Sequence, residues 1–148
     1  MTQPSSMRVV RIVGRIVALA ALLLLSSCAK PVTKNDQESR EGAALYEKSC
    51  AGCHGADATG NGPIAPVIGV RPPDLTRIAE RRSGTFPELE IFRIIDGQAD
   101  LSAHGPRHMP VWGYEFFGDD ADDEVAHRQA QRKVERLVSY LRSIQRED

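Results

Sequence analysis

The segment Cys50-Ala51-Gly52-Cys53-His54 constrains this chain more than any other part of its sequence. Two thiols three residues apart, followed at once by a histidine, form the attachment pattern of a c-type haem. The two sulfurs can form thioether bonds with the vinyl groups on one porphyrin edge, which brings the His54 imidazole to the iron as a proximal ligand. The motif therefore predicts one covalently bound haem c, with Cys50 and Cys53 as its attachment residues.

Two other chemistries could use the same pair of cysteines. A thioredoxin-like dithiol needs a βαβ context, and no such alternation follows the motif. A Cys2His2 zinc site could recruit His104 and His108, which form an H-x3-H pair. About fifty residues separate these histidines from the cysteines, far more than in a zinc finger, and Gly105 and Pro106 prevent them from sharing a helix face. Haem attachment is the favoured interpretation.

The amino terminus has the features of an export signal. Basic residues at positions 8, 11 and 15 precede an unbroken apolar run over residues 16–25, and small residues follow it. The run is shorter than the roughly 20 apolar residues that a transmembrane helix needs. We therefore expect residues 1–27 to be a signal peptide.

The end of this signal, Leu25-Ser26-Ser27-Cys28, resembles a bacterial lipobox. The resemblance implies cleavage before Cys28, which becomes the lipidated first residue; an uncleaved signal anchor is the alternative. It also implies a lipid-anchored protein on the periplasmic face, and Ala29 favours the outer membrane over the inner. Because haem is attached outside the cytoplasmic membrane in bacteria, the export signal and the haem motif support each other.

Charge and composition limit the remaining functions. The chain has 19 basic and 20 acidic residues, and loss of the signal removes basic residues only, so the mature protein is acidic. It has no polybasic surface for nucleic acid or anionic lipid, and membrane attachment would depend on the lipid. Residues 28–40 are polar and lack aromatic residues, which is typical of a flexible tether, and residues 41–148 are enough for one small domain.

Helical patterns dominate that domain, and no strand pattern stands out. The first helix is expected over residues 36–49, with Asp36 as its N-cap. A middle helix is expected to start at Pro87 and to end before Gly97. Its predicted buried face consists of Leu89, Phe92 and Ile95.

The last helix carries the strongest signals. An acidic run at its start and basic residues at its end both suit the helix dipole, and we interpret the acidic run as a solvated helix start rather than a calcium site. Between residues 55 and 85, glycine and proline predict loops with at most one short helix. The acidic run is Asp119, Asp120, Asp122, Asp123 and Glu124, the apolar stripe is Val134, Leu137, Val138 and Leu141, and the basic residues are Arg142 and Arg146.

Residues flanking the motif resemble class I cytochromes c. Gly42 and Tyr46 precede Cys50 at intervals of four, and Leu137, Tyr140 and Leu141 follow the family pattern in the last helix. The resemblance implies an all-α, small cytochrome c fold, in which three to five helices wrap around one covalently attached haem. It also implies that the first and last helices cross closely where Gly42 has no side chain.

The same resemblance suggests the sixth iron ligand. Met109-Pro110 followed by Trp112-Gly113 is similar to the methionine loop of bacterial class I cytochromes c. A thioether is a soft ligand that suits Fe(II), so His/Met ligation raises the reduction potential. No other methionine would remain after signal cleavage. His108 or His104 is the alternative ligand, and an open site is the third possibility.

Further contacts around the iron are implied by the family. A carbonyl from a proline soon after the motif accepts from the ligating imidazole; Pro63 occupies that place, and Pro66 is the alternative. Trp112 packs near the haem edge or simply in the core. Arg71 neutralises a propionate or is a solvated loop residue, and His127 is interpreted as a surface residue.

The function implied is electron transfer rather than catalysis. Both axial positions would be occupied, and no Ser-His-Asp set, paired carboxylates or phosphate loop appears elsewhere. We expect a membrane-tethered carrier between respiratory or dehydrogenase partners, with redox proteins as its partners and no nucleic acid. The alternatives are a haem c subunit of a membrane-associated oxidoreductase complex and, third, a haem-based sensor or peroxidase-like enzyme, which requires Met109 to leave the iron.

Overall fold

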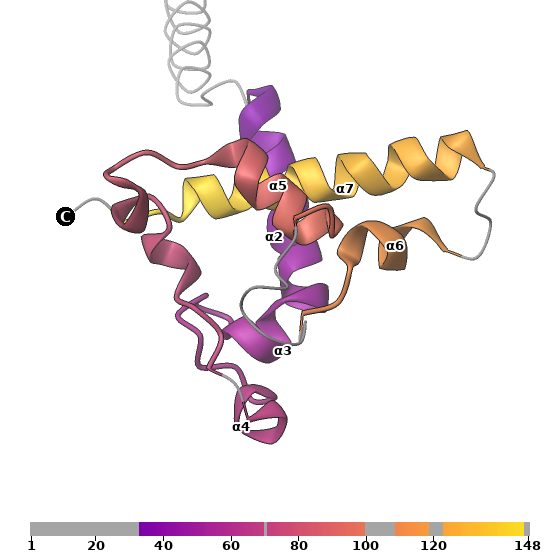
Figure 1. The fold of residues 1–148 in the computed structure, drawn as a ribbon. Helices are drawn as coiled ribbons and strands as arrows, with labels where there is room; N and C mark the ends of the chain where they lie inside the picture. The colour runs from indigo at the N-terminus through magenta and orange to yellow at the C-terminus, as the bar shows by residue number, and fades with distance from the viewer. Residues whose placement is uncertain (1–32, 70, 100–108, 119–122, 147–148) are drawn as a thin grey trace, which may run out of the picture. The chain divides into compact units, whose positions relative to one another are not determined.

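A computed structural model describes residues 33–69, 71–99, 109–118 and 123–146, and these contain helices and turns but no strand. The expected all-α fold is confirmed. Among the described residues, four helices are longer than a single turn, and four short elements lie between α2 and α5 along the chain (Figure 1). The elements are α2 (Lys34–Ser49), α3 (Ala51–His54), α4 (Ala65–Ile68), η1 (Leu75–Arg77), η2 (Glu80–Arg82), α5 (Glu88–Asp96), α6 (Trp112–Phe117) and α7 (Glu124–Ser143), where η marks a 3₁₀ turn.

Helix α2 begins earlier than expected. Thr33 is its N-cap: the Thr33 hydroxyl accepts from the Asp36 amide at 3.2 Å, and the Asp36 carboxylate accepts from the Thr33 amide at 3.0 Å. This reciprocal pair is a capping box, so Asp36 is the third helical residue and not the cap. Because residues 34–40 are helical, the prediction of a tether reaching Arg40 is wrong there, and the compact unit starts at Thr33.

Helices α2 and α7 cross at close range, as Figure 1 shows. A Cβ atom on Gly42 would lie 2.0 Å from the Arg136 carbonyl oxygen, so only glycine allows this approach. The predicted close crossing at Gly42 is confirmed. Beside it, Arg136 Nε pairs with Glu41 Oε2 at 2.7 Å.

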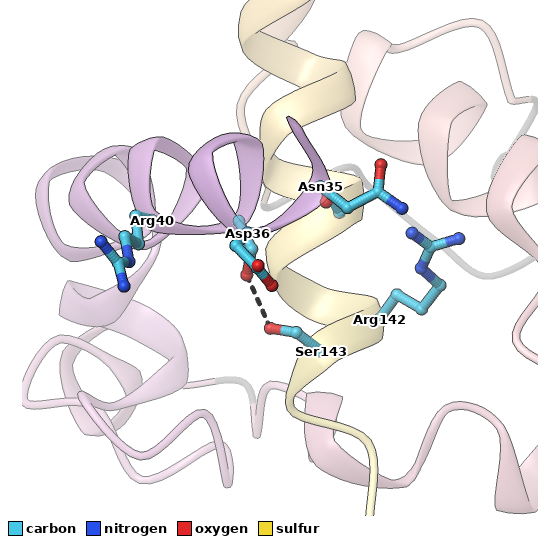
Figure 2. Close-up of a pocket in the computed structure, with 7 residues that line it drawn as sticks. Asn35, Asp36, Arg40, Arg142 and Ser143 are labelled. Carbon is cyan, nitrogen blue, oxygen red and sulfur yellow. Dashed lines mark hydrogen bonds between the residues drawn. The ribbon is translucent and has the colours of Figure 1, made fainter. Parts of the chain in front are cut away.

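The other end of the α2–α7 contact is polar. Ser39 and Ser143 share a hydrogen bond of 2.9 Å between their hydroxyls (Figure 2). This bond lies beside an open hollow of about 330 Å³, formed by the first turns of α2 and the last turns of α7. The hollow is at the opposite end of α2 from the cysteine motif. Its lining consists of Asn35, Asp36, Ser39, Arg40, Ser139, Arg142 and Ser143.

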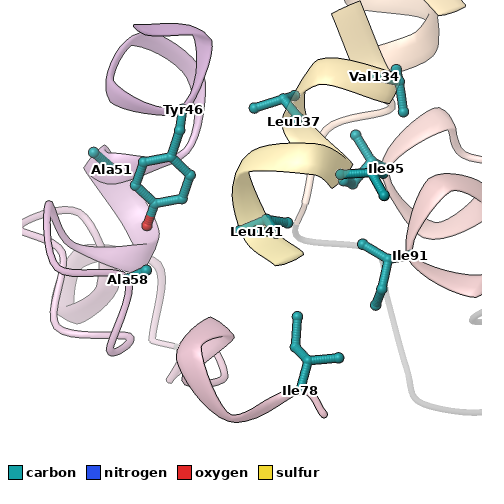
Figure 3. Packing of buried hydrophobic residues seen from close by; sticks show 10 residues of the cluster. Tyr46, Ala51, Ala58, Ile78, Ile91, Ile95, Val134, Leu137 and Leu141 are labelled. Atoms are coloured by element: carbon teal, nitrogen blue, oxygen red, sulfur yellow. The ribbon is translucent and has the colours of Figure 1, made fainter. Parts of the chain in front are cut away.

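The core lies where α2, α5 and α7 meet (Figure 3). The expected stripe of α7 is buried in full: Val134, Leu137, Val138 and Leu141. Helix α5 differs from its prediction, because Leu89 is 63% exposed while Ile91 and Ile95 are buried. Ile91 and Ile95 are four residues apart and share one helix face, whereas Leu89 lies on the opposite side.

Pro87 is the N-cap of α5 rather than its first residue, and the helix ends before Gly97 as predicted. Helix α7 begins after Asp123, whose carboxylate accepts from the Val125 amide at 2.7 Å; the earlier acidic residues lie outside the described ranges. Residues 55–85 contain one short α-helix, α4, and the two 3₁₀ turns. No helix in the described parts of the chain has both the length and the apolar character needed to cross a membrane.

Candidate functional site

The two cysteines and the histidine lie together on the short helix α3, directly after α2. Cys50 ends α2 and begins α3: its amide donates to the Tyr46 carbonyl at 2.8 Å, and its carbonyl accepts from the His54 amide at 2.9 Å. Cys50 and Cys53 are free, half-buried thiols. One helical turn therefore presents both sulfurs and the imidazole from adjacent positions.

The His54 ring has one nitrogen engaged by the protein. Its Nδ1 lies 3.3 Å from the Pro73 carbonyl oxygen. A carbonyl can only accept, so Nδ1 carries the proton in this contact and Nε2 is the nitrogen left for a metal. Burial lowers the pKa of His54, against a smaller raising effect of the Pro73 carbonyl. The neutral ring is the form that binds a metal.

This contact corrects the prediction that Pro63 supplies the acceptor. The amides of Gly60 and Gly62 donate to the carbonyls of His54 and Cys53, at 2.8 and 3.2 Å, so the loop that contains Pro63 packs against the end of α3 through its backbone. Pro63 and the alternative, Pro66, are both exposed. The chain returns later, where the Leu75 amide donates to the Ala58 carbonyl at 2.8 Å. That return brings Pro73 to His54.

Tyr46 makes a contact that the sequence pattern did not reveal. Its ring is buried, 1% exposed, and its hydroxyl donates to the Gly55 carbonyl at 2.7 Å. Gly55 has φ of +82°, and a Cβ there would lie 1.9 Å from Asn61 Oδ1. The tyrosine thus fixes the turn immediately after His54. The glycine following the motif was the available signal for such a turn.

The loop that begins at Met109 is anchored on the end of α5. A Cβ on Gly97 would lie 2.3 Å from the Val111 side chain, and a Cβ on Gly113 would lie 2.2 Å from the Asp96 carboxylate. Met109 is half-buried and packs against the same apolar cluster that Cys50 contacts. The absence of side chains at Gly97 and Gly113 therefore lets Val111 and the first turn of α6 lie against the end of α5.

The other predicted contacts have mixed outcomes. Trp112 packs against the core, 5.5 Å from the Phe116 ring between centroids. Arg71 is exposed and lines an open hollow of about 470 Å³ together with Gly60 and neighbouring loop residues. His127 is exposed, in keeping with a surface role, and stacks on Phe117 at 3.8 Å between ring centroids.

The electrostatics disfavour a redox dithiol. Burial raises the pKa of the Cys50 thiol to about 12, and the neighbouring Cys53 adds to the effect. Reactive Cys-x-x-Cys pairs need a lowered thiol pKa. A zinc site finds no support in the described ranges, where no group of three or more His, Cys, Asp or Glu side chains is arranged to hold a metal ion. His104 and His108 lie outside those ranges, as does Cys28.

The donor set suits a c-type haem. It combines two free thiols on one turn, an imidazole held through Nδ1 with Nε2 available, and a thioether against the shared apolar core. Sulfur and imidazole donors of this kind are the axial ligands that haem iron takes in electron-transfer proteins.

The family model described as Cytochrome c matches residues 39–145, which include α3, the Met109 loop and α7. No curated protein and no solved structure matched the chain.

Proposed function

Because this chain belongs to the cytochrome c family, we propose that it is a membrane-tethered electron carrier whose single haem has His54 and Met109 as axial ligands. Membership in the family makes the chain a haem-based electron carrier that binds haem c covalently. The individual ligands, the lipid anchor and the location are the parts that we propose.

The attachment residues in the proposal are Cys50 and Cys53, with His54 as the proximal ligand. The observation that carries it is the contact of 3.3 Å between His54 Nδ1 and the Pro73 carbonyl. That contact fixes the tautomer and orients Nε2 as the ligand atom, which is the usual arrangement of a metal-binding imidazole.

Met109 is the proposed sixth ligand. It packs against the core that Cys50 also contacts, on a loop anchored through Gly97 and Gly113. Anchoring of this kind keeps a weak thioether ligand in place without relying on the bond to the metal alone. His104 and His108 stay the alternatives.

Electron transfer follows from this ligand set. Haem c, when bound, supplies one-electron chemistry between Fe(III) and Fe(II). His54 and Met109 together would leave no axial position for a small substrate, so the chain would exchange electrons with redox protein partners instead of catalysing a reaction. The half-buried cysteines keep one side of the site near the surface, where such a partner can approach.

The lipid anchor in the proposal is Cys28, on the periplasmic face and preferably at the outer membrane. It is supported by the lipobox-like residues before Cys28 and by the acidic balance of the mature chain, which leaves lipid as the means of attachment.

The three cysteines allow a matched experiment. Cys28→Ser should release the protein from membranes or block its processing while leaving covalent haem in place, detected on a denaturing gel stained for haem. Cys50→Ser and Cys53→Ser should weaken or abolish the covalent haem signal without changing the membrane fraction. Full covalent haem in Cys50→Ser, or unchanged processing and membrane attachment in Cys28→Ser, would contradict the corresponding assignment.

The sixth ligand has its own test. The oxidised protein should show the weak charge-transfer band between methionine sulfur and iron, and Met109→Ala should abolish it. The matched variants His104→Ala and His108→Ala should keep the band. Persistence of the band in Met109→Ala would remove methionine from the proposal.

A further inference from the structure

The segment that reaches His54 is held at three successive carbonyls. The segment consists of Pro73 and Asp74, which precede η1, and Leu75, the first residue of η1. Each of their carbonyl oxygens accepts a hydrogen bond from a side chain outside the segment. The donors are His54 Nδ1 to Pro73 at 3.3 Å, Arg81 Nη2 to Asp74 at 2.7 Å, and Gln145 Nε2 to Leu75 at 2.8 Å.

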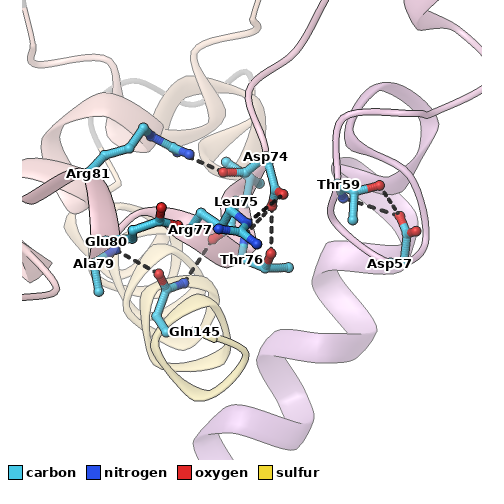
Figure 4. Close-up of polar contacts among 10 residues, drawn as sticks. All are labelled: Asp57, Thr59, Asp74, Leu75, Thr76, Arg77, Ala79, Glu80, Arg81 and Gln145. Carbon is cyan, nitrogen blue, oxygen red and sulfur yellow. Dashed lines mark hydrogen bonds and ion pairs between the residues drawn. The ribbon is translucent and has the colours of Figure 1, made fainter. Parts of the chain in front are cut away.

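Gln145 makes the largest set of these contacts. Its Nε2 donates to the Leu75 and Leu141 carbonyls, at 2.8 and 2.7 Å, and its Oε1 accepts from the Ala79 amide at 2.9 Å (Figure 4). The amide therefore joins the residues after α7 to Leu75, the first residue of η1, and to Ala79, the N-cap of η2. Gln145 is half-buried, so water cannot freely replace all three bonds.

Further hydrogen bonds hold the backbone next to Leu75. The Arg146 amide donates to the Thr76 carbonyl at 2.9 Å, next to the Leu75 contact. The Asp74 carboxylate accepts from the Thr76 amide and hydroxyl, at 2.8 and 2.6 Å, which keeps the turn into η1 closed. Residues 75 and 76 are thus held by Gln145 and Arg146, while the Asp74 carboxylate bonds within the turn.

Arg81 also bonds the segment, but it holds the backbone less firmly than Gln145. It is exposed and contacts a single carbonyl, that of Asp74. Water can take the place of an exposed donor at little cost. Gln145 differs because it is half-buried and makes three hydrogen bonds, one of them to the segment at Leu75.

We propose that Gln145 is a positioning residue for His54, acting through the backbone between Leu75 and Pro73; this rests on the proposed role of His54 as an iron ligand. Gln145 holds the Leu75 carbonyl, and the short, proline-stiffened segment passes that constraint to the Pro73 carbonyl. The strength of the bond from Nδ1 to Pro73 sets the basicity of the imidazole. Loosening the segment would weaken this bond.

The test uses the full-length holoprotein with Gln145→Leu, which keeps the volume of the side chain and removes its three hydrogen bonds. The His54 Nδ1 proton should exchange with solvent about fivefold faster, the scale of one neutral hydrogen bond, measured by NMR on the reduced protein. The reduction potential should rise, because a less basic imidazole stabilises Fe(III) less. Solvent entry alone would lower the potential instead.

A second variant and a control separate positioning from stability. Gln145→Glu keeps the acceptor for the Ala79 amide but loses the donor to Leu75, so the faster exchange should appear there too. Val134→Ala lowers the stability of the core and removes no hydrogen bond to the segment, so it should leave the exchange rate unchanged.

The outcomes separate the positioning role of Gln145 from the role of His54 as an iron ligand. Exchange at the wild-type rate in both Gln145 variants, or an equal change in Val134→Ala, would overturn the positioning role while the haem assignment stands. Unchanged haem absorption in His54→Ala would remove the proximal ligand, and the positioning role with it.

Discussion

In Gly42→Ala, helix propensity and packing against α7 change the stability of the domain in opposite directions. Helix propensity alone favours alanine over glycine by about 1 kcal/mol. Packing opposes it, because the new Cβ would lie 2.0 Å from the Arg136 carbonyl oxygen and 2.8 Å from Tyr140 Cβ. The first contact is with backbone, which cannot rotate away.

The size of the effect follows from the distance. Carbon-to-oxygen contacts normally start near about 3.3 Å, so α2 and α7 would have to separate by more than about 1 Å. A gap of that size forfeits up to about half of each dispersion contact across the crossing, where Tyr46 and Leu137 are fully buried. Overpacking costs about 3 kcal/mol at its upper range. After the gain in propensity, Gly42→Ala should destabilise the domain by about 2 kcal/mol.

Equilibrium denaturation of the holoprotein measures this directly. The unfolding equilibrium of Gly42→Ala should shift about thirtyfold toward the unfolded state, with an unchanged denaturant slope. Ala44→Gly is the matched control, because Ala44 is exposed on the same helix and should lose only the propensity difference of about 1 kcal/mol. A neutral or stabilising effect of Gly42→Ala would refute the close crossing as a constraint.

Two further predictions concern hydrogen bonds of α2. Tyr46→Phe should lower the free energy of unfolding by about 1–3 kcal/mol, because the buried Gly55 carbonyl loses its hydrogen-bond partner. The control is Tyr140→Phe, whose hydroxyl has no hydrogen bond among the described residues and whose free energy of unfolding should stay within about 0.5 kcal/mol of wild type. Equal losses in the two variants would contradict the assignment. Hydrogen bonds from the Thr33 amide and hydroxyl lower the pKa of Asp36 from 3.8 in the folded protein. The ionised Asp36 carboxylate therefore contributes its full stabilisation of the fold above the unfolded pKa, and this stabilisation is lost as the pH falls through the lower folded pKa. The stability difference between wild type and Asp36→Asn should therefore shrink on acidification, and a difference independent of pH would argue against the capping box.

The secondary structure was predictable wherever the relevant interactions are close in sequence. The apolar stripe of α7 repeats with the helical period, so its burial against a core could be anticipated from Val134, Leu137 and Leu141. Where two local signals competed, the prediction failed. Asp36 and Thr33 can each cap a helix, and only the reciprocal bonds between them decide that Thr33 is the cap.

The chemistry of the site could be read from the residues alone, because Cys50, Cys53 and His54 are neighbours on one turn and their spacing is independent of the rest of the fold. What holds that turn depends on tertiary contacts. Pro73 replaces Pro63 at the histidine, Tyr46 holds Gly55, and Gln145 fixes Leu75. These contacts form because a loop and the residues after α7 fold back close to the motif in space. The spacing of residues along the sequence does not reveal where such distant segments meet.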